Sequence, residues 1–166
     1  MGRPSRLPSI TYKGPGAYFV TTCTHHRCRI FDCVAAVDLT LMHFLRAADR
    51  ANVEISAYCF MPDHLHLLVT AQRDRADLVS FMRLAKQMSG YAFQQSRGLK
   101  LWQTGYHERV LRADEDSLTV IAYMVANPFR AGLVARPADW PHWGSACYSR
   151  EAVLEAIAVG RVPRGT

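Results

Sequence analysis

The sequence lacks the features of a membrane-spanning or secreted protein. Its longest mostly apolar run, residues 118–126, contains Thr119 and stops at Asn127. A membrane-spanning helix needs roughly 20 apolar residues, so this run is too short. The opening stretch, MGRPSRLPSI, has no apolar segment of the kind found in signal peptides. We therefore expect no membrane partner and a cytoplasmic location.

Paired cysteines are also missing. The chain has five cysteines, an odd number, and none of them forms a Cys-x-x-Cys motif. Cys23, Cys28 and Cys33 are spaced too widely for such a pair, and no second pair follows them. This pattern argues against a disulfide framework and a structural zinc site, and it favours reduced thiols.

Acidic residues are absent from two long segments, although the whole chain contains 14 of them. Residues 1–31 and residues 78–101 carry basic side chains only. The basic side chains considered for nucleic acid are Arg3, Arg6, Lys13, Arg83 and Lys86. With a net charge of +6, such clustering favours a polyanionic partner such as DNA. A solvated basic surface is the alternative.

The order of the expected elements indicates an α+β domain. Alternating and β-branched stretches predict strands at residues 17–24, 53–61, 64–71 and 107–113. Helical spacing of apolar residues predicts helices at residues 34–51, 76–98, about 114–126 and 151–159. Pro128 should end the third helix near Ala126. The order β-α-β-β-α-β followed by an additional helix is that of the ferredoxin-like, or RRM-like, class.

Two histidines stand one residue apart within the third expected strand, in the stretch PDHLHLLV. Side chains alternate along a strand, so His64 and His66 project together from one face. Leu65, Leu67 and Val69 project from the other face and should pack on helices. The imidazoles could be half-buried and bonded to neighbours, or they could supply two ligands of a metal site. Two ligands are too few for a three-ligand zinc site, so a third must come from elsewhere.

Three stretches, taken together, carry a resemblance to a known family. They are AYCFMPDHLHLLVT (residues 57–70), LWQTGYHERVLR (residues 101–112) and AYMVANPFRAGLV (residues 122–134). In this order they resemble the single-tyrosine HUH transposases of small bacterial insertion sequences, in particular the REP-associated tyrosine transposases. HUH denotes histidine, a bulky hydrophobic residue and histidine, which here is His64-Leu65-His66. The resemblance spans about Arg3 to Val134.

The resemblance implies a nucleophile, a third metal ligand and a cofactor. In that family a tyrosine on the helix after the last strand attacks a DNA phosphate, and Tyr123 has that position. A polar ligand four residues later corresponds to Asn127. Taken alone, Tyr123 could be a core aromatic residue and Asn127 a helix-ending residue. With His64 and His66, Asn127 would hold Mg²⁺ or Mn²⁺, ions that suit such donors and leave positions open.

The same resemblance implies a function. The expected activity is that of a metal-dependent endonuclease and strand transferase for single-stranded DNA hairpins, with a 5′-phosphotyrosine intermediate. Trp102 could stack on a base or lie in the core. We expect residues 1–136 to form the HUH domain and residues 137–166 a tail packed on it or extending from it. The protein could be a nucleoid-associated monomer or homodimer. A domesticated hairpin-binding protein with a weak active site is the alternative; a small metal-dependent hydrolase is a remote one.

Overall fold

An antiparallel sheet forms the centre of the molecule in the computed structural model, which describes residues 15–71 and 76–160. The strands are β1 (Gly16–Cys23), β2 (Glu54–Met61), β3 (His64–Ala71), β4 (His107–Val110) and β5 (Trp143–Ser145). Their order across the sheet is β4-β1-β3-β2-β5. The predicted β-α-β-β-α-β order is confirmed, and β3, which carries both histidines, is the central strand.

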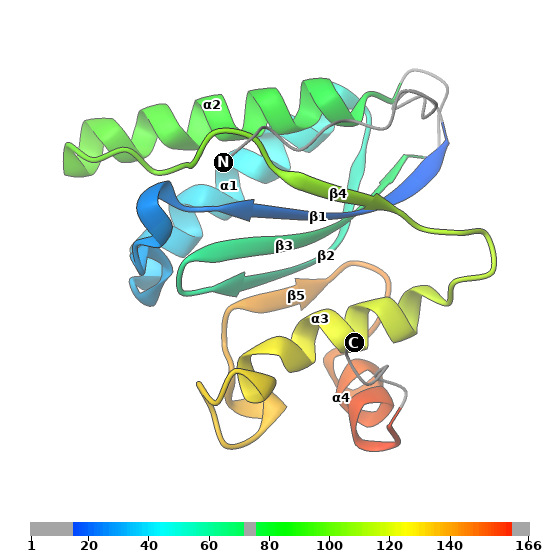
Figure 1. The fold of residues 1–166 in the computed structure, drawn as a ribbon. Coiled ribbons are helices and arrows are strands. Elements are labelled where there is room, and N and C mark those ends of the chain that lie inside the picture. Colours follow the sequence, from blue (N-terminus) through cyan, green and yellow to red (C-terminus); the bar gives the residue numbers. More distant parts are fainter. Residues whose placement is uncertain (1–14, 72–75, 161–166) are drawn as a thin grey trace.

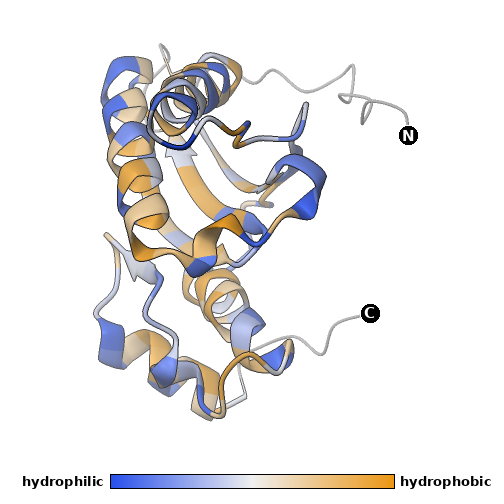
Figure 2. Cartoon of the chain, turned by 90° about the vertical axis from the view of Figure 1, so that its left-hand side faces the viewer, coloured by the Kyte–Doolittle hydropathy of each residue, from blue (hydrophilic) through white to orange (hydrophobic). Residues whose placement is uncertain are grey.

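Four helices cover the two faces of this sheet within the described residues (Figure 1). The helices α1 (Val34–Ala51) and α2 (Leu78–Arg97) lie on one face. The helices α3 (Ser117–Arg130) and α4 (Arg150–Ala158) lie on the other. Figure 2 shows hydrophobic colouring on the strands between these two helix layers. None of the helices in the described ranges is long and apolar enough to cross a membrane.

The alternation along β3 separates two hydrophobic cores. Leu65, Leu67 and Val69 belong to the core beneath α1 and α2, where they are fully buried. Leu68 belongs to the second core, together with Ile121 of α3. His64 and His66 share the face of Leu68 because side chains two residues apart point the same way. The histidines therefore face the layer that contains α3.

Local signals define the ends of the first two helices. Asn52 follows α1 in the left-handed conformation, with φ 54°, as suits a residue that ends a helix. Asp77 precedes α2, and its carboxylate accepts a hydrogen bond from the backbone N–H of Ser80 at 2.9 Å. Gly98 ends the helix with φ 69°. The sequence-based prediction of both helices is confirmed to within two residues.

The strand register brings β1 beside the two histidines. Pro62 and Asp63 form the turn between β2 and β3. On the opposite side of β3, Thr21 of β1 pairs with His66 and Cys23 pairs with His64. Side chains paired in this way lie on the same face of a sheet. The register therefore places a hydroxyl and a thiol next to the imidazoles.

Two features differ from the sequence-based expectation. The helix α3 does not end at Ala126 but continues through Pro128 to Arg130. Pro128 is buried, and its packing outweighs the hydrogen bond that its nitrogen cannot donate. The second difference is β5, which was not predicted and pairs with β2 at the edge of the sheet. Part of the expected tail, residues 143–145, is thus a strand of the central sheet.

Candidate active site: a histidine pair on the central strand

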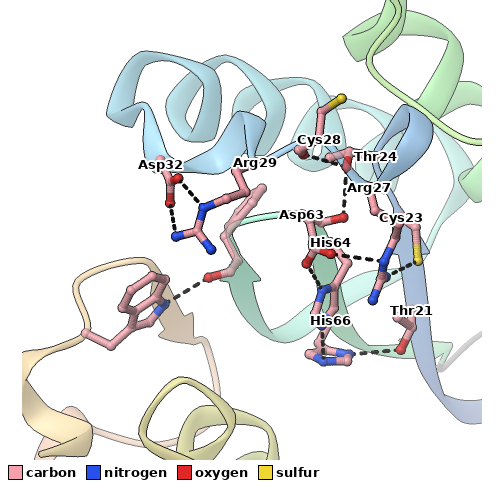
Figure 3. A network of polar contacts seen from close by, with 12 residues as sticks. Thr21, Cys23, Thr24, Arg27, Cys28, Arg29, Asp32, Asp63, His64 and His66 are labelled. Carbon is pink, nitrogen blue, oxygen red and sulfur yellow. Dashed lines mark hydrogen bonds and ion pairs between the residues drawn. The ribbon is translucent and has the colours of Figure 1, made fainter. Parts of the chain in front are cut away.

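The imidazoles of His64 and His66 converge on one another. Their Nε2 atoms are 3.1 Å apart, and the two rings stand nearly perpendicular, at 86°. The ring of Phe19, from β1, lies beside His66 with a centroid separation of 5.4 Å. Figure 3 shows the pair within a series of polar contacts that extends on both sides. Two adjacent ring nitrogens therefore form the centre of the candidate site.

Each histidine uses its other ring nitrogen for a different partner. Nδ1 of His64 lies 2.6 Å from Asp63 Oδ1. An ionised carboxylate only accepts hydrogen bonds, so this Nδ1 carries the proton, and Nε2 of the neutral ring is the acceptor in its 3.1 Å contact with Nε2 of His66. Nδ1 of His66 lies 2.9 Å from Thr21 Oγ1. A hydroxyl can donate or accept, so Thr21 supports either tautomer of His66, whereas Asp63 supports one tautomer of His64.

Burial keeps both imidazoles neutral. Removal from water lowers the pKa of His64 below its ordinary value, although the Asp63 carboxylate opposes this effect. Burial, with smaller effects of His64 and Arg27, lowers the pKa of His66 to about 3. A neutral imidazole is the form that binds a metal ion. At neutral pH, the binding of a metal ion therefore does not require either imidazole to give up a positive charge first.

The spacing of the two Nε2 atoms suits two ligands of a single cation. Two nitrogens that are each about 2.1 Å from an ion, at right angles, lie about 3.0 Å apart. The observed separation is 3.1 Å. Within residues 15–71 and 76–160, no group of three or more His, Cys, Asp or Glu side chains could hold a metal ion. A third ligand from this part of the chain would therefore have to be of another type, such as an amide oxygen.

Tyr123 and Asn127 lie on α3, the helix that packs on the histidine face of the sheet. Both residues are half-buried, and their spacing of four places them on the same side of the helix. The guanidinium of Arg130 lies over the Tyr123 ring, 4.9 Å from its centroid. In Figure 1 the C-terminal end of α3 lies toward the β2–β3 turn. Among the described contacts, no hydrogen bond joins Tyr123 or Asn127 to either histidine.

The predicted DNA-binding residues on α2 lie in the other helix layer. Arg83 is exposed there. Lys86 is partly buried, and its ammonium group donates hydrogen bonds to the backbone carbonyls of Gln103, at 2.8 Å, and Gly105. Burial lowers the pKa of Lys86 to about 8. Lys86 therefore fastens residues 103–105 to α2, a structural task that the sequence did not indicate.

Trp102 belongs to the core beneath α1 and α2, which is the second of the two alternatives that the sequence left open for it. The residue is 5% exposed. Its indole N–H donates to Ser89 Oγ at 2.9 Å, and its ring lies against Phe31 and Phe44. An indole enclosed in this way has no face left for a base. Arg3, Arg6 and Lys13, the other predicted DNA-binding residues, lie outside the described residues.

Three site residues escaped the sequence-based prediction. Asp63 was given no role in the site, although its place directly before His64 allows the contact between their side chains. Thr21 could not be identified, because its neighbourhood depends on the register between β1 and β3. Arg27 lies in the acid-free segment of residues 1–31 and was not singled out, yet it forms an ion pair with Asp63 at 3.0 Å. Adjacency in the sequence was the available signal for Asp63 alone.

Comparison with known proteins identifies one family. The sequence profile of the family "Transposase IS200 like" matches residues 16–127. The REP-associated tyrosine transposase of Escherichia coli K12 is 32% identical over 89 residues, which cover 53% of this chain and 52% of that protein. The chain thus spans about half the length of this curated relative. A Haemophilus influenzae protein proposed to be of the same kind is 23% identical over 138 residues, covering 76% and 78% of the two chains.

Solved structures share the fold. One is a REP-associated tyrosine transposase bound to a REP hairpin, with a TM-score of 0.69 and 24% identity, covering 84% of this chain and 81% of that one. Another is a Deinococcus radiodurans protein proposed to be a transposase, with a TM-score of 0.52 and 18% identity, covering 78% and 92%. At these identities the likeness concerns the fold, and it includes the α+β architecture described above.

Proposed function

Because the chain belongs to the family of IS200-like transposases, we propose that it is a metal-dependent endonuclease and strand transferase for single-stranded DNA. One observation carries the proposal: the Nε2 atoms of His64 and His66 converge at 3.1 Å on the sheet face that α3 covers. That helix bears Tyr123 and Asn127. The arrangement supplies a nitrogen pair, a phenol and an amide to the same side of the sheet.

The residues suited to a divalent cation are His64, His66 and Asn127. Two neutral imidazoles and an amide oxygen leave positions for water and phosphate oxygens, as Mg²⁺ and Mn²⁺ prefer. A cation bound there would neutralise charge on the phosphoryl oxygens of the scissile phosphate. Asp63 and Thr21 hold the histidines through Nδ1, which leaves Nε2 directed at the ligand position.

Tyr123 is the proposed nucleophile. Its hydroxyl oxygen would attack the scissile phosphorus and lose its proton, and the bond from phosphorus to the 3′ oxygen would break. The products are a 5′-phosphotyrosine link and a free 3′-OH. The 3′-OH of another strand could then attack the phosphotyrosine and release Tyr123. One phosphoester bond forms for each that breaks, so no external energy source is required.

A DNA hairpin is the proposed substrate. The support is a structural relative that was solved bound to a REP hairpin, together with the net charge of +6, which suits a phosphate backbone. Arg3, Arg6 and Lys13 are proposed to contact DNA, as is Arg83. Lys86 would have to release its carbonyl partners to do so. The protein would work as a monomer or a homodimer.

A hairpin-binding protein with weak or no catalysis is the second candidate. One observation favours it: Tyr123 lies under Arg130 and makes no hydrogen bond to the histidine pair within the described residues. In that case hairpin DNA would bind while Tyr123 stayed away from the scissile phosphate. The two functions share a binding step and differ in the chemical step.

An experiment on His64 separates the two candidates. Wild-type protein and the variant His64→Ala are incubated with a labelled single-stranded hairpin and Mn²⁺, and cleavage and affinity are measured in parallel. We expect the variant to lose cleavage activity by at least about a hundredfold, because removing one group that stabilises charge in a transition state typically lowers the rate by roughly 100–1,000-fold. The affinity of the variant for the hairpin should stay within about threefold of wild type.

Other outcomes decide against the enzyme. Tight hairpin binding by the wild type without cleavage under Mg²⁺ or Mn²⁺ would support the binding protein. Equal loss of affinity and cleavage in His64→Ala would mean that the histidines act in folding. Absence of DNA affinity at low salt would contradict both candidates.

A further inference from the structure

The side chain of Arg27 reaches the histidine pair through a second residue. Arg27 ends a single 3-10 turn, His25–Arg27, in the loop that follows β1. Its Nε donates to Asp63 Oδ2 at 3.0 Å, and its Nη1 donates to Cys23 Sγ at 2.8 Å. The other carboxylate oxygen of Asp63 accepts from Nδ1 of His64 at 2.6 Å. Figure 3 shows this continuous series from Arg27 through Asp63 to His64.

The backbone at Arg27 has an unfavourable conformation. His26 and Arg27 have φ values of 53° and 56°, in the left-handed region that residues with a Cβ atom rarely adopt. Such a backbone persists where surrounding contacts fix it, and it concentrates at functional sites. The fold thus retains strain at the residue whose side chain contacts Asp63.

Backbone hydrogen bonds fasten this loop to the turn before His64. The N–H of Thr24 donates to the carbonyl of Asp63 at 3.0 Å, and Thr24 Oγ1 lies 2.9 Å from the same oxygen. Further along, the N–H of Phe31 donates to the carbonyl of Pro62 at 2.9 Å. These bonds fix the loop relative to the turn, so the Arg27 guanidinium and the Asp63 carboxylate meet in a defined position.

A second ion pair in the same loop, between Arg29 and Asp32, differs from the Arg27–Asp63 pair in what its carboxylate contacts. Arg29 and Asp32 are three residues apart and form a pair at 2.8 Å, with side chains 62% and 47% exposed. That pair leads to no further side chain in the described residues. In the Arg27–Asp63 pair the side chains are 52% and 25% exposed, and His64, which Asp63 contacts, is 15% exposed. Such exposed pairs contribute little to stability. What distinguishes the Arg27–Asp63 pair is that its carboxylate also contacts the partly buried imidazole of His64.

We propose that Arg27 is a positioning residue for the histidine pair. It holds the Asp63 carboxylate so that Asp63 accepts from Nδ1 of His64, which keeps the proton on Nδ1 and directs the lone pair of Nε2 toward the cation position. The proposal rests on the metal-binding role of His64 in the proposed function. It assigns to Arg27 a task in preparing the site before any DNA is bound.

The first test is a spectroscopic measurement without metal or DNA. Two-bond ¹H–¹⁵N correlation spectra of ¹⁵N-histidine-labelled full-length protein report which ring nitrogen carries the proton. We expect the Nδ1–H tautomer of His64 in the wild type and a mixture of tautomers in Arg27→Gln. The control variant Arg29→Gln breaks the matched ion pair in the same loop, and it should retain the wild-type tautomer.

The second test is the affinity for Mn²⁺ alone, measured by titration calorimetry. Loss of a residue that orients a metal ligand typically lowers metal affinity by roughly 10–100-fold. Since Arg27 acts through Asp63, we expect Arg27→Gln to bind about tenfold more weakly and Arg27→Lys to show a smaller loss. Arg29→Gln should bind within twofold of wild type. Circular dichroism checks that each variant is folded.

The outcomes separate this inference from the proposed function. An unchanged tautomer together with unchanged Mn²⁺ affinity in folded Arg27→Gln would overturn the role of Arg27. If Arg27→Gln does not fold, the same two measurements on Arg27→Lys decide, and wild-type values there would overturn it. If the wild type itself binds no Mn²⁺, the proposed function fails, and the tautomer of His64 still decides whether Arg27 positions the ring.

Discussion

His66 is a histidine whose neutrality follows from its surroundings. It lies on the central strand, beside Phe19 and Thr21 and against His64. Burial lowers its pKa to about 3, against an ordinary value near 6.5. Between these two pH values His66 is protonated in the unfolded chain and neutral in the folded chain. Folding therefore becomes less favourable as the pH falls through this window.

This difference gives a prediction for the protein without metal. The free energy of unfolding should be fully retained above about pH 6.5 and should decline from there toward pH 3, at up to about 1.4 kcal/mol per pH unit for this one group. Chemical denaturation at a series of pH values measures the decline. The variant His66→Gln should show a shallower decline than the wild type. Parallel curves for the two proteins would contradict a neutral, buried His66.

At the scale of residues, the prediction agrees with the structure where the alternation of side chains along a strand determines which face a residue occupies. His64 and His66 were expected to share a face because side chains alternate along a strand, and the cores on the two faces of β3 confirm it. Trp102 was left undecided because aromatic residues can stack on bases or fill cores. Its partner Ser89 is 13 residues distant, and only the packed fold reveals this contact.

The helix α3 is the element on which the proposed chemistry depends. Asp116 caps its first turn, and its carboxylate accepts from the backbone N–H of Leu118 at 3.3 Å and of Thr119 at 3.2 Å. Buried residues on one side, including Ile121 and Met124, fix the helix to the sheet. Tyr123 lies about two turns along from this cap. The stability of the helix start therefore bears on the placement of the proposed nucleophile.

Replacement of this cap should weaken the helix measurably. Loss of an N-cap carboxylate typically costs about 1 kcal/mol, with a range of roughly 0.5–2 kcal/mol. We expect Asp116→Ala to lower the free energy of unfolding by this amount, and Asp116→Ser to recover most of it. Denaturant titrations of the three proteins give the values. An unchanged stability in Asp116→Ala would show that this end of α3 is held by packing alone.

At the scale of elements, long periodic segments were predictable and short ones were not. The boundaries of α1 and β3 agree with the expectation because their apolar periodicity extends over most of each segment. The strand β5 has three residues, Trp143–Ser145, with a glycine in the middle. Three residues carry no recognisable period. Their pairing with β2 depends on contacts with a strand far away in the sequence.

At the scale of the whole molecule, the central sheet separates the larger hydrophobic core from the candidate site. The core beneath α1 and α2 contains most of the large buried side chains, including Phe44 and Phe81. The opposite face carries the histidine pair and the smaller core beneath α3 and α4. The residue Val153 of α4, within the expected tail, is fully buried there. The sequence could not indicate this packing because the members of this core are spread along the chain from Ala57 to Val153.

The central claim is that Tyr123 forms the covalent link to DNA. The most direct measurement is mass spectrometry of the full-length protein after incubation with a single-stranded hairpin and Mn²⁺, followed by denaturation and proteolysis. We predict a mass increase equal to a 5′-phosphorylated DNA fragment on the peptide that contains Tyr123, and its loss in Tyr123→Phe. Cleaved DNA without any protein adduct, or an adduct on another residue that persists in Tyr123→Phe, would contradict the account.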